Sequence, residues 1–220
     1  MIFEARRYLG AVGFLAALAA SVTACSEEVG DGAEEAVADD DDDGADGADS
    51  TGTSSSAVSL PGRWTLPAAV RTAGARVRIT YDDGPAWNSR LCAGGLRAGT
   101  QKLRTHLDQK FPDITSLQGY ACRANTANAS RMSIHGTGRA LDIFIPRSGS
   151  AADNTKGDKV ANYLVSNAQE LQIQYIIWDR TKWRANGTND AAYTGPNPHT
   201  DHLHVEITEE AAAKTATWYR

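Results

Sequence analysis

The chain has 220 residues, of which 22 are Lys or Arg, 27 are Asp or Glu and three are Cys. This length suits one or two domains. The formal net charge is −5, but acidic residues are concentrated near the amino end, and residues 58–220 carry 20 basic against 14 acidic side chains. A basic folded part favours an anionic polymer as its partner. We exclude nucleic acid, because the sequence has no zinc-knuckle, helix-turn-helix or basic–aromatic pattern.

The amino end has the order of a secretory signal. Arg6 and Arg7 precede an apolar run, Leu9–Ala20, and small residues then lead to Cys25. This order is typical of a signal peptide, and the run is too short to span a bilayer comfortably as a permanent helix. Residues 22–25, Val-Thr-Ala-Cys, resemble the bacterial lipobox, which implies cleavage before Cys25 and lipidation of its thiol. The alternative is an ordinary signal peptide with a Cys near its cleavage site.

The next segment has a different composition. Between Glu27 and Ala57 there are twelve Asp and Glu, no Lys or Arg and no aromatic residue. Such a segment has too little apolar surface to offset its ordering entropy, and its like charges repel. We therefore expect a signal peptide over 1–24, a disordered acidic linker over 25–57 and one folded domain over 58–220.

The other two cysteines, Cys92 and Cys122, form an even pair in a chain that carries an export signal. Neither has a second Cys or a His at metal-ligand spacing. We expect a disulfide between them, which would contribute about 3–4 kcal/mol in the chain-entropy model.

Hydrophobic periodicity predicts the elements of the first half of the domain. Alternation predicts a strand around Val77–Tyr81, and a one-sided leucine pattern predicts a helix over Thr100–Phe111, ended by Pro112. Further strands are predicted over Ile114–Cys122 and Leu141–Ile145, with a polar loop over Asn125–Arg131 between them.

In the second half, Asp153 is placed to cap a helix, and Ile173–Trp178 reads as an apolar strand. A loop over Thr181–Thr200, a strand over His202–Ile207 and a short helix over Ala211–Trp218 are predicted to follow. Strands and helices that do not alternate regularly predict an α+β domain, with an antiparallel sheet packed with a few helices.

The residues with the clearest chemistry are His135, Asp142 and His204. Imidazoles and carboxylates are the ligands that zinc prefers when no thiolate is offered, and three protein ligands leave a fourth position open, as in catalytic sites. His202 and His204 share a strand face because they are two residues apart. The sequence therefore predicts a metal site at the sheet.

At this point a resemblance is evident. Ser133-x-His135-x-x-Gly138-x-Ala140-x-Asp142 fits the S-x-H-x-x-G-x-A-x-D motif of the D-alanyl-D-alanine carboxypeptidase family of zinc peptidases, within the wider lysostaphin and hedgehog group. That family's second motif is H-x-H, or an acidic residue three before the last histidine; here Asp201, His202 and His204 satisfy both. The resemblance covers residues 110–208 and implies that Zn2+ is bound by His135, Asp142 and His204.

The resemblance also implies an activity, hydrolysis of amide bonds in peptidoglycan stem peptides. We expect a D-Ala carboxypeptidase of D,D or L,D type; the alternatives are a peptidoglycan endopeptidase and a non-catalytic, zinc-containing wall-binding lipoprotein. Asp201 is favoured as general base, with His202 stabilising the tetrahedral intermediate. If Asp201 lies on the strand proper, the role of base passes to His202. We expect an exported monomer, anchored to the membrane by lipid in the bacterial cell envelope.

Two substrate-binding residues follow from the resemblance, Arg123 and Ser133. Family members carry an arginine just after a tyrosine upstream of the first motif, whereas here two residues separate Tyr120 from Arg123. The Cys-Arg variant is more similar to extensin-like carboxy-terminal domains. For Arg123 the alternative is a solvated loop residue, and for Ser133 a local turn role. Glu206 is expected either to support the metal ligands or to face a basic residue.

Overall fold

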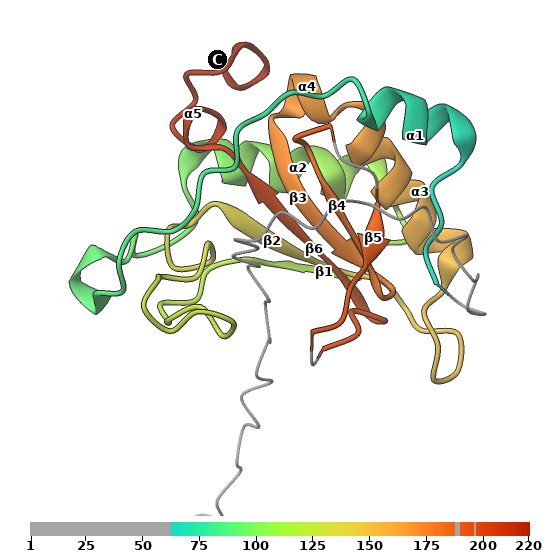
Figure 1. Ribbon diagram of the computed structural model, residues 1–220, viewed down its shortest axis with the longest axis horizontal. Coiled ribbons are helices and arrows are strands. Elements are labelled where there is room, and N and C mark those ends of the chain that lie inside the picture. Colours follow the sequence, from blue (N-terminus) through green and yellow to red (C-terminus); the bar gives the residue numbers. More distant parts are fainter. Residues whose placement is uncertain (1–62, 188–189, 196) are drawn as a thin grey trace, which may run out of the picture. The chain divides into compact units, whose positions relative to one another are not determined.

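Figure 1 shows the computed structural model, which describes residues 63–187, 190–195 and 197–220. The predicted signal peptide, Cys25 and the acidic linker lie outside the described residues. The helices there are α1 (Ala68–Gly74), α2 (Ala98–Lys110), α3 (Asn154–Ser166), α4 (Ala168–Leu171) and α5 (Glu209–Ala212), with short 3-10 helices η1 (Ser89–Leu91) and η2 (Thr217–Tyr219). The strands are β1 (Ser116–Gln118), β2 (Ala140–Phe144), β3 (Ile173–Trp178), β4 (Thr181–Arg184), β5 (Ala191–Ala192) and β6 (His202–Ile207).

Across these described ranges the strands form one six-stranded sheet in the order β1-β2-β6-β3-β4-β5. Each neighbouring pair is antiparallel. Helices α2, α3 and α4 pack against the sheet (Figure 1). The predicted α+β class with an antiparallel sheet is confirmed.

The two faces of the sheet differ because side chains alternate along each strand. Leu141 and Ile143 of β2 belong to the main core, together with Leu203 and Val205 of β6. The residues between them are polar and buried, namely Asp142, His202, His204 and Glu206. One face of the sheet therefore packs on the helices, and the other carries the chemistry.

Helix α3 begins where the sequence predicts. The Asp153 carboxylate accepts a hydrogen bond from Lys156 N at 3.2 Å, which satisfies one of the free N–H groups of the first turn. The helix buries Val160 and Leu164 in the core, and burying a side chain of this kind contributes about 1.5–3 kcal/mol. Helix α2, close to its predicted bounds, buries Leu103 and Leu107 in the same core.

The predicted strand over Val77–Tyr81 is wrong. Val77 and Ile79 are buried, but the segment is not assigned to any strand of the described sheet. Its N–H groups are satisfied in other ways: Arg78 N donates to Gln169 Oε1 at 3.2 Å, and Ile79 N donates to Ala185 O at 2.9 Å. A side-chain amide thus replaces part of the ladder that a neighbouring strand would provide.

The predicted loop over Thr181–Thr200 is wrong in part, because β4 and β5 lie within it. Strands β3 and β4 are joined by Asp179 and Arg180, whose φ values are 36° and 62°. Two-residue hairpin turns of this kind usually contain Asn or Gly, so the sequence carries no ordinary turn signal.

Two other bounds also differ from those predicted. Only Ser116–Gln118 of the predicted Ile114–Cys122 strand is a strand. The predicted terminal helix over Ala211–Trp218 is split into α5 and η2, with Lys214 at a φ of 60° between them. Of the helices in the described ranges, none has both the length and the apolar character needed to cross a membrane.

Candidate metal centre

The three predicted ligands meet on the polar face of the sheet. Asp142 of β2 lies directly opposite His204 of β6 in the antiparallel register, which explains how residues 62 positions apart become neighbours. Asp142 Oδ1 lies 3.2 Å from His204 Nδ1 and 3.4 Å from His135 Nε2, and the two imidazole nitrogens are 3.1 Å apart. All three side chains are buried.

His135 comes from the turn that precedes β2. Ser133 Oγ accepts a hydrogen bond from His135 N at 3.3 Å, and Gly136 N donates to Ser133 O at 2.8 Å. Gly138 has a φ of 72°, and a Cβ there would lie only 2.4 Å from Gly95 O, so the turn requires glycine at this position. The turn places the His135 ring beside Asp142 and His204.

The outer nitrogen of each ligand histidine faces an oxygen acceptor. His135 Nδ1 lies 2.7 Å from the backbone oxygen of Gly119, and His204 Nε2 lies 3.1 Å from Glu206 Oε1. Asp142 Oδ1 is an acceptor on the inner side of both rings, so the outer acceptors hold the ring protons when the inner nitrogens serve as metal ligands. His135 Nε2 and His204 Nδ1 are then left with lone pairs that face each other and Asp142.

This donor set fits a metal ion. Three electron-pair donors converge within a few ångströms, and their ligand atoms all lie within 4.8 Å of one another. A cation placed between these three donors is attracted by each of them. The buried group His135, Asp142 and His204 can therefore hold a metal ion, with one coordinating atom from each residue.

Asp201 and His202 form a pair beside this group. Asp201 precedes β6, and its Oδ1 accepts a hydrogen bond from His202 Nδ1 at 2.8 Å, while Oδ2 accepts from the Arg147 guanidinium at 2.9 Å. The hydrogen bond from His202 is the main reason that the pKa of Asp201 falls from 3.8 to about 2, and Arg147 lowers it further. Asp201 is therefore ionised near neutral pH, with its two oxygens bonded to different partners.

The predicted substrate-binding residues lie close together in the backbone. Ser133 N donates to Arg123 O at 3.1 Å. The Ser133 side chain is fully buried and its hydroxyl is bonded to His135 N, which is the local turn role. Arg123 is partly exposed, with Nη1 3.4 Å from Ala124 O.

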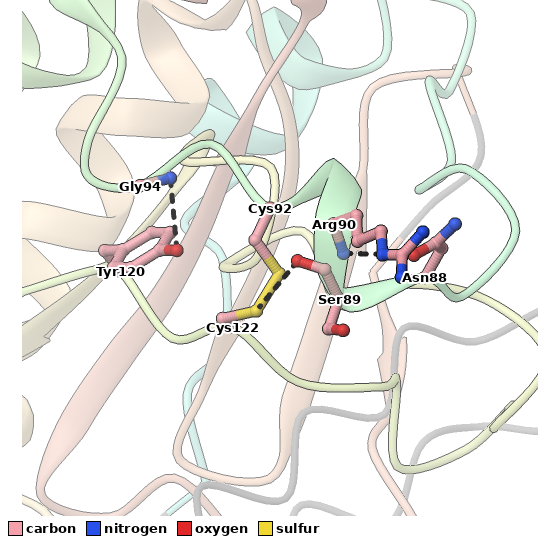
Figure 2. Close-up of a disulfide and its surroundings, with 7 residues drawn as sticks. All are labelled: Asn88, Ser89, Arg90, Cys92, Gly94, Tyr120 and Cys122. Carbon is pink, nitrogen blue, oxygen red and sulfur yellow. Dashed lines mark hydrogen bonds between the residues drawn. A yellow bond between two sulfur atoms is a disulfide. The ribbon is translucent and has the colours of Figure 1, made fainter.

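The predicted disulfide between Cys92 and Cys122 is confirmed, and Figure 2 shows its surroundings. Near the bridge, Tyr120 OH accepts a hydrogen bond from Gly94 N at 3.1 Å. Two backbone oxygens near Cys122 in the chain hold the ligand turn. Gly119, three residues before Cys122, holds His135, and Arg123, the next residue, holds Ser133. The bridge therefore ties the segment that supports the metal ligands to the loop around η1.

Sequence reasoning missed several residues of this face. Gln174 is buried and bonded to Glu206, and Arg147 reaches Asp201 from beyond the end of β2. The His199 ring is buried, with its centroid 4.8 Å from that of His202 and 5.2 Å from that of Tyr193. The one sequence signal was the nearness of His199 to the second motif; Gln174 and Arg147 are recognisable only once the strands are paired.

Comparisons with known proteins add one finding. No curated protein and no solved structure matches the chain significantly. The family model described as "VldE, C-terminal domain" matches residues 92–204, just over half of the chain. The match runs from the first disulfide cysteine to the last candidate ligand, and it includes His135, Asp142 and the Asp201–His202 pair. The chain belongs to the VldE C-terminal domain family.

Proposed function

We propose that this chain is a zinc peptidase that hydrolyses peptidoglycan stem peptides as a D-Ala carboxypeptidase. The observation that carries the proposal is the buried group His135, Asp142 and His204, with the Asp201–His202 pair beside it. The motif that resembles the D-alanyl-D-alanine carboxypeptidase family supplies the substrate class. The export signal and lipobox in the sequence agree with a place beside the cell wall.

The separations between the three donor atoms support zinc. A tetrahedral zinc ion with bonds of about 2.0 Å needs donor atoms about 3.3 Å apart. The donor pairs here are 3.1, 3.2 and 3.4 Å apart. Two His and one carboxylate are also a ligand set of catalytic zinc, which leaves one position for water or substrate. When bound there, zinc supplies a Lewis acid that polarises a carbonyl and lowers the pKa of water.

His202 is the residue that we assign as general base. The Asp201 carboxylate accepts a hydrogen bond from His202 Nδ1–H, so the proton stays on Nδ1. His202 Nε2 can then take a proton from the attacking water and pass it to the leaving amine. Asp201 itself is a poor base, because its pKa is about 2 and both its oxygens are engaged. This reverses the preference for Asp201 that the sequence motif gave.

Arg123 is the residue that we assign to the carboxylate end of the substrate. A carboxypeptidase substrate ends in a carboxylate, and a guanidinium binds such a group through two parallel hydrogen bonds. Arg123 is partly exposed, and its backbone lies against Ser133 at the base of the His135 turn. Ser133 then contributes by shaping the turn rather than by touching the substrate.

The test is release of D-alanine from a synthetic stem pentapeptide by the full chain loaded with zinc. Wild type and the exposed control Asp108→Asn should release one D-Ala per peptide. Asp142→Asn should lose most of the activity, because the change removes a charged ligand of the proposed zinc ion. A chelator should abolish release, and added zinc should restore it. Equal activity of Asp142→Asn and wild type, or wall binding without turnover, would contradict the proposal. A crosslinked muropeptide dimer serves as the second substrate. If the protein separates this dimer but releases no D-Ala, it is an endopeptidase.

A further inference from the structure

Glu206 is a buried carboxylate in line with the metal ligands. It has no measurable exposure and lies two residues beyond His204 on the same face of β6. Its Oε1 lies 3.1 Å from His204 Nε2, the ring nitrogen that faces away from Asp142. A carboxylate on the outer nitrogen of a ligand histidine fixes the ring and makes the inner nitrogen a stronger electron donor.

The other oxygen of Glu206 is held by Gln174. Gln174 Nε2 donates to Glu206 Oε2 at 2.9 Å and to Asp82 O at 3.1 Å, while Gln174 Oε1 accepts from Asp82 N at 3.0 Å. These two bonds to one backbone unit fix which end of the Gln174 amide faces Glu206. The donor end of the amide faces Glu206 Oε2, which accepts the hydrogen bond.

An irregularity in the sheet aims Gln174 at this face. The pairing of β3 with β6 slips between Ile173 and Tyr175, so that Gln174 is an extra residue on its strand. Ile173 and Ile176 both face the helix-side core although they are three residues apart, which strict alternation forbids. A bulge re-aims a side chain in this way at the cost of ladder pairing, and here the re-aimed side chain is the partner of Glu206.

Charge gives an independent reason for this arrangement. Glu206 and Asp142 are both buried, and they lie on opposite sides of the His204 ring. Burying one carboxylate is costly and burying two more so, unless positive charge compensates them. A divalent ion held by His135, Asp142 and His204 would compensate the charge of both carboxylates.

We infer that Glu206 and Gln174 are positioning residues for the metal ligand His204. Glu206 holds the His204 proton at Nε2 and keeps Nδ1 aimed at the ion, and Gln174, held by the bulge and by Asp82, keeps Glu206 in place. This inference rests on the metal site of the proposed function. It assigns neither residue to contact with the substrate.

The test measures the dissociation constant for Zn2+ with the full chain, in competition with a chromophoric chelator. Glu206→Leu should weaken zinc binding by about 100-fold, because the acceptor and its charge are both lost, and Glu206→Gln by about 10-fold, because an acceptor oxygen remains. Gln174→Leu should weaken it by about 10-fold or less. The controls Glu210→Gln and Gln101→Leu, both exposed, should bind zinc as wild type does.

A second measurement does not depend on any variant. Nitrogen-15 spectra of the imidazole groups in the zinc-loaded wild type should place the His204 proton on Nε2 and show that it exchanges slowly with water. A proton on Nδ1, or folded Glu206 variants that bind zinc like wild type, would overturn the inference while leaving the metal site in place. A wild type that binds no zinc would instead remove the proposed function. Thermal unfolding of the metal-free variants distinguishes a positioning role from a merely structural one. A merely structural role would lower the stability of the variant and leave its zinc affinity unchanged.

Discussion

At the scale of single residues, the Asp201–His202 pair decides the proposed proton transfer. A residue adjacent to a strand can point to either side, and the sequence could not say on which side Asp201 lies. The structure places its carboxylate between His202 Nδ1 and the Arg147 guanidinium. In the proposed mechanism the carboxylate therefore orients the base, His202, and does not act as the base itself.

Replacing the two residues should separate their roles. His202→Gln should lower kcat by about 100-fold or more, since a general base contributes about 10²–10⁴ in rate. Asp201→Asn should lower kcat less, because the base remains but its ring loses its acceptor partner. Zinc affinity should stay at the wild-type value in both, because neither side chain is a proposed ligand. A larger loss with Asp201→Asn than with His202→Gln would restore Asp201 as the base.

The depressed pKa of Asp201 predicts a pH dependence of stability. The carboxyl titrates at about 2 in the folded chain and nearer 3.8 when unperturbed, so the folded state binds fewer protons between these values. Its contribution to stability is therefore complete above about pH 4 and is lost as the pH falls through about 2. Asp201→Asn should flatten the stability curve in that window, measured by denaturant unfolding at several pH values. The effect should be small because Asp201 is one-third exposed, and an unchanged slope would contradict it.

At the scale of elements, helix α3 depends on a glycine that helix propensity disfavours. Alanine is a better helix former than glycine by about 1 kcal/mol. A Cβ on Gly157, however, would lie 2.1 Å from Trp178 Cζ2. The indole is fully buried, and its N–H donates to Asp158 at 2.9 Å, so it has little freedom to move. The steric cost therefore outweighs the gain in propensity.

Gly157→Ala should lower the free energy of unfolding by about 1–3 kcal/mol, the range for an overpacked core. Denaturant unfolding of the full chain measures it. Gly95→Ala is a suitable comparison, because a Cβ at Gly95 would meet nothing within 4 Å. If Gly157→Ala were as stable as wild type or more so, the close packing of α3 on β3 would be wrong.

The disulfide should stabilise both the fold and the metal centre. Cys92 and Cys122 are 30 residues apart, and a bridge of this span contributes about 3–4 kcal/mol in the chain-entropy model. The double change Cys92→Ser and Cys122→Ser should remove that stability and weaken zinc binding, because Gly119 and Arg123 beside Cys122 hold the ligand turn. Cys25→Ser is the matched control and should leave both quantities unchanged. Loss of stability without loss of zinc affinity would show that the disulfide does not support the metal centre.

Some elements of the fold can be predicted from local sequence patterns, and others cannot. Strands β3 and β6 are fully buried apolar or alternating runs, and α3 has a capping Asp153, so local patterns predict all three. The β3–β4 hairpin was missed because Asp179 and Arg180 adopt positive φ without glycine or asparagine. The position of Gln174 was missed because a bulge arises from the pairing of two strands, which a single strand's sequence does not contain.

At the scale of the whole molecule, the candidate metal ligands were predictable and the residues that support them were not. His135 and Asp142 fall within one short motif, and His204 lies in a second, so residue type and spacing identify them. Gly119, Gln174 and Arg147 act through a backbone oxygen or through neighbours brought near by the fold. Their roles depend on strand order and register, which residue patterns do not specify.

The central claim is that His135, Asp142 and His204 together hold one zinc ion, and metal analysis of the full chain tests it most directly. After dialysis against zinc and removal of the excess, elemental analysis should find about one zinc per wild-type chain. His204→Ala should retain a small fraction of that amount, while its fold, followed by far-ultraviolet circular dichroism, remains. Wild type without stoichiometric zinc, or a folded His204→Ala variant that keeps a full equivalent, would contradict the account.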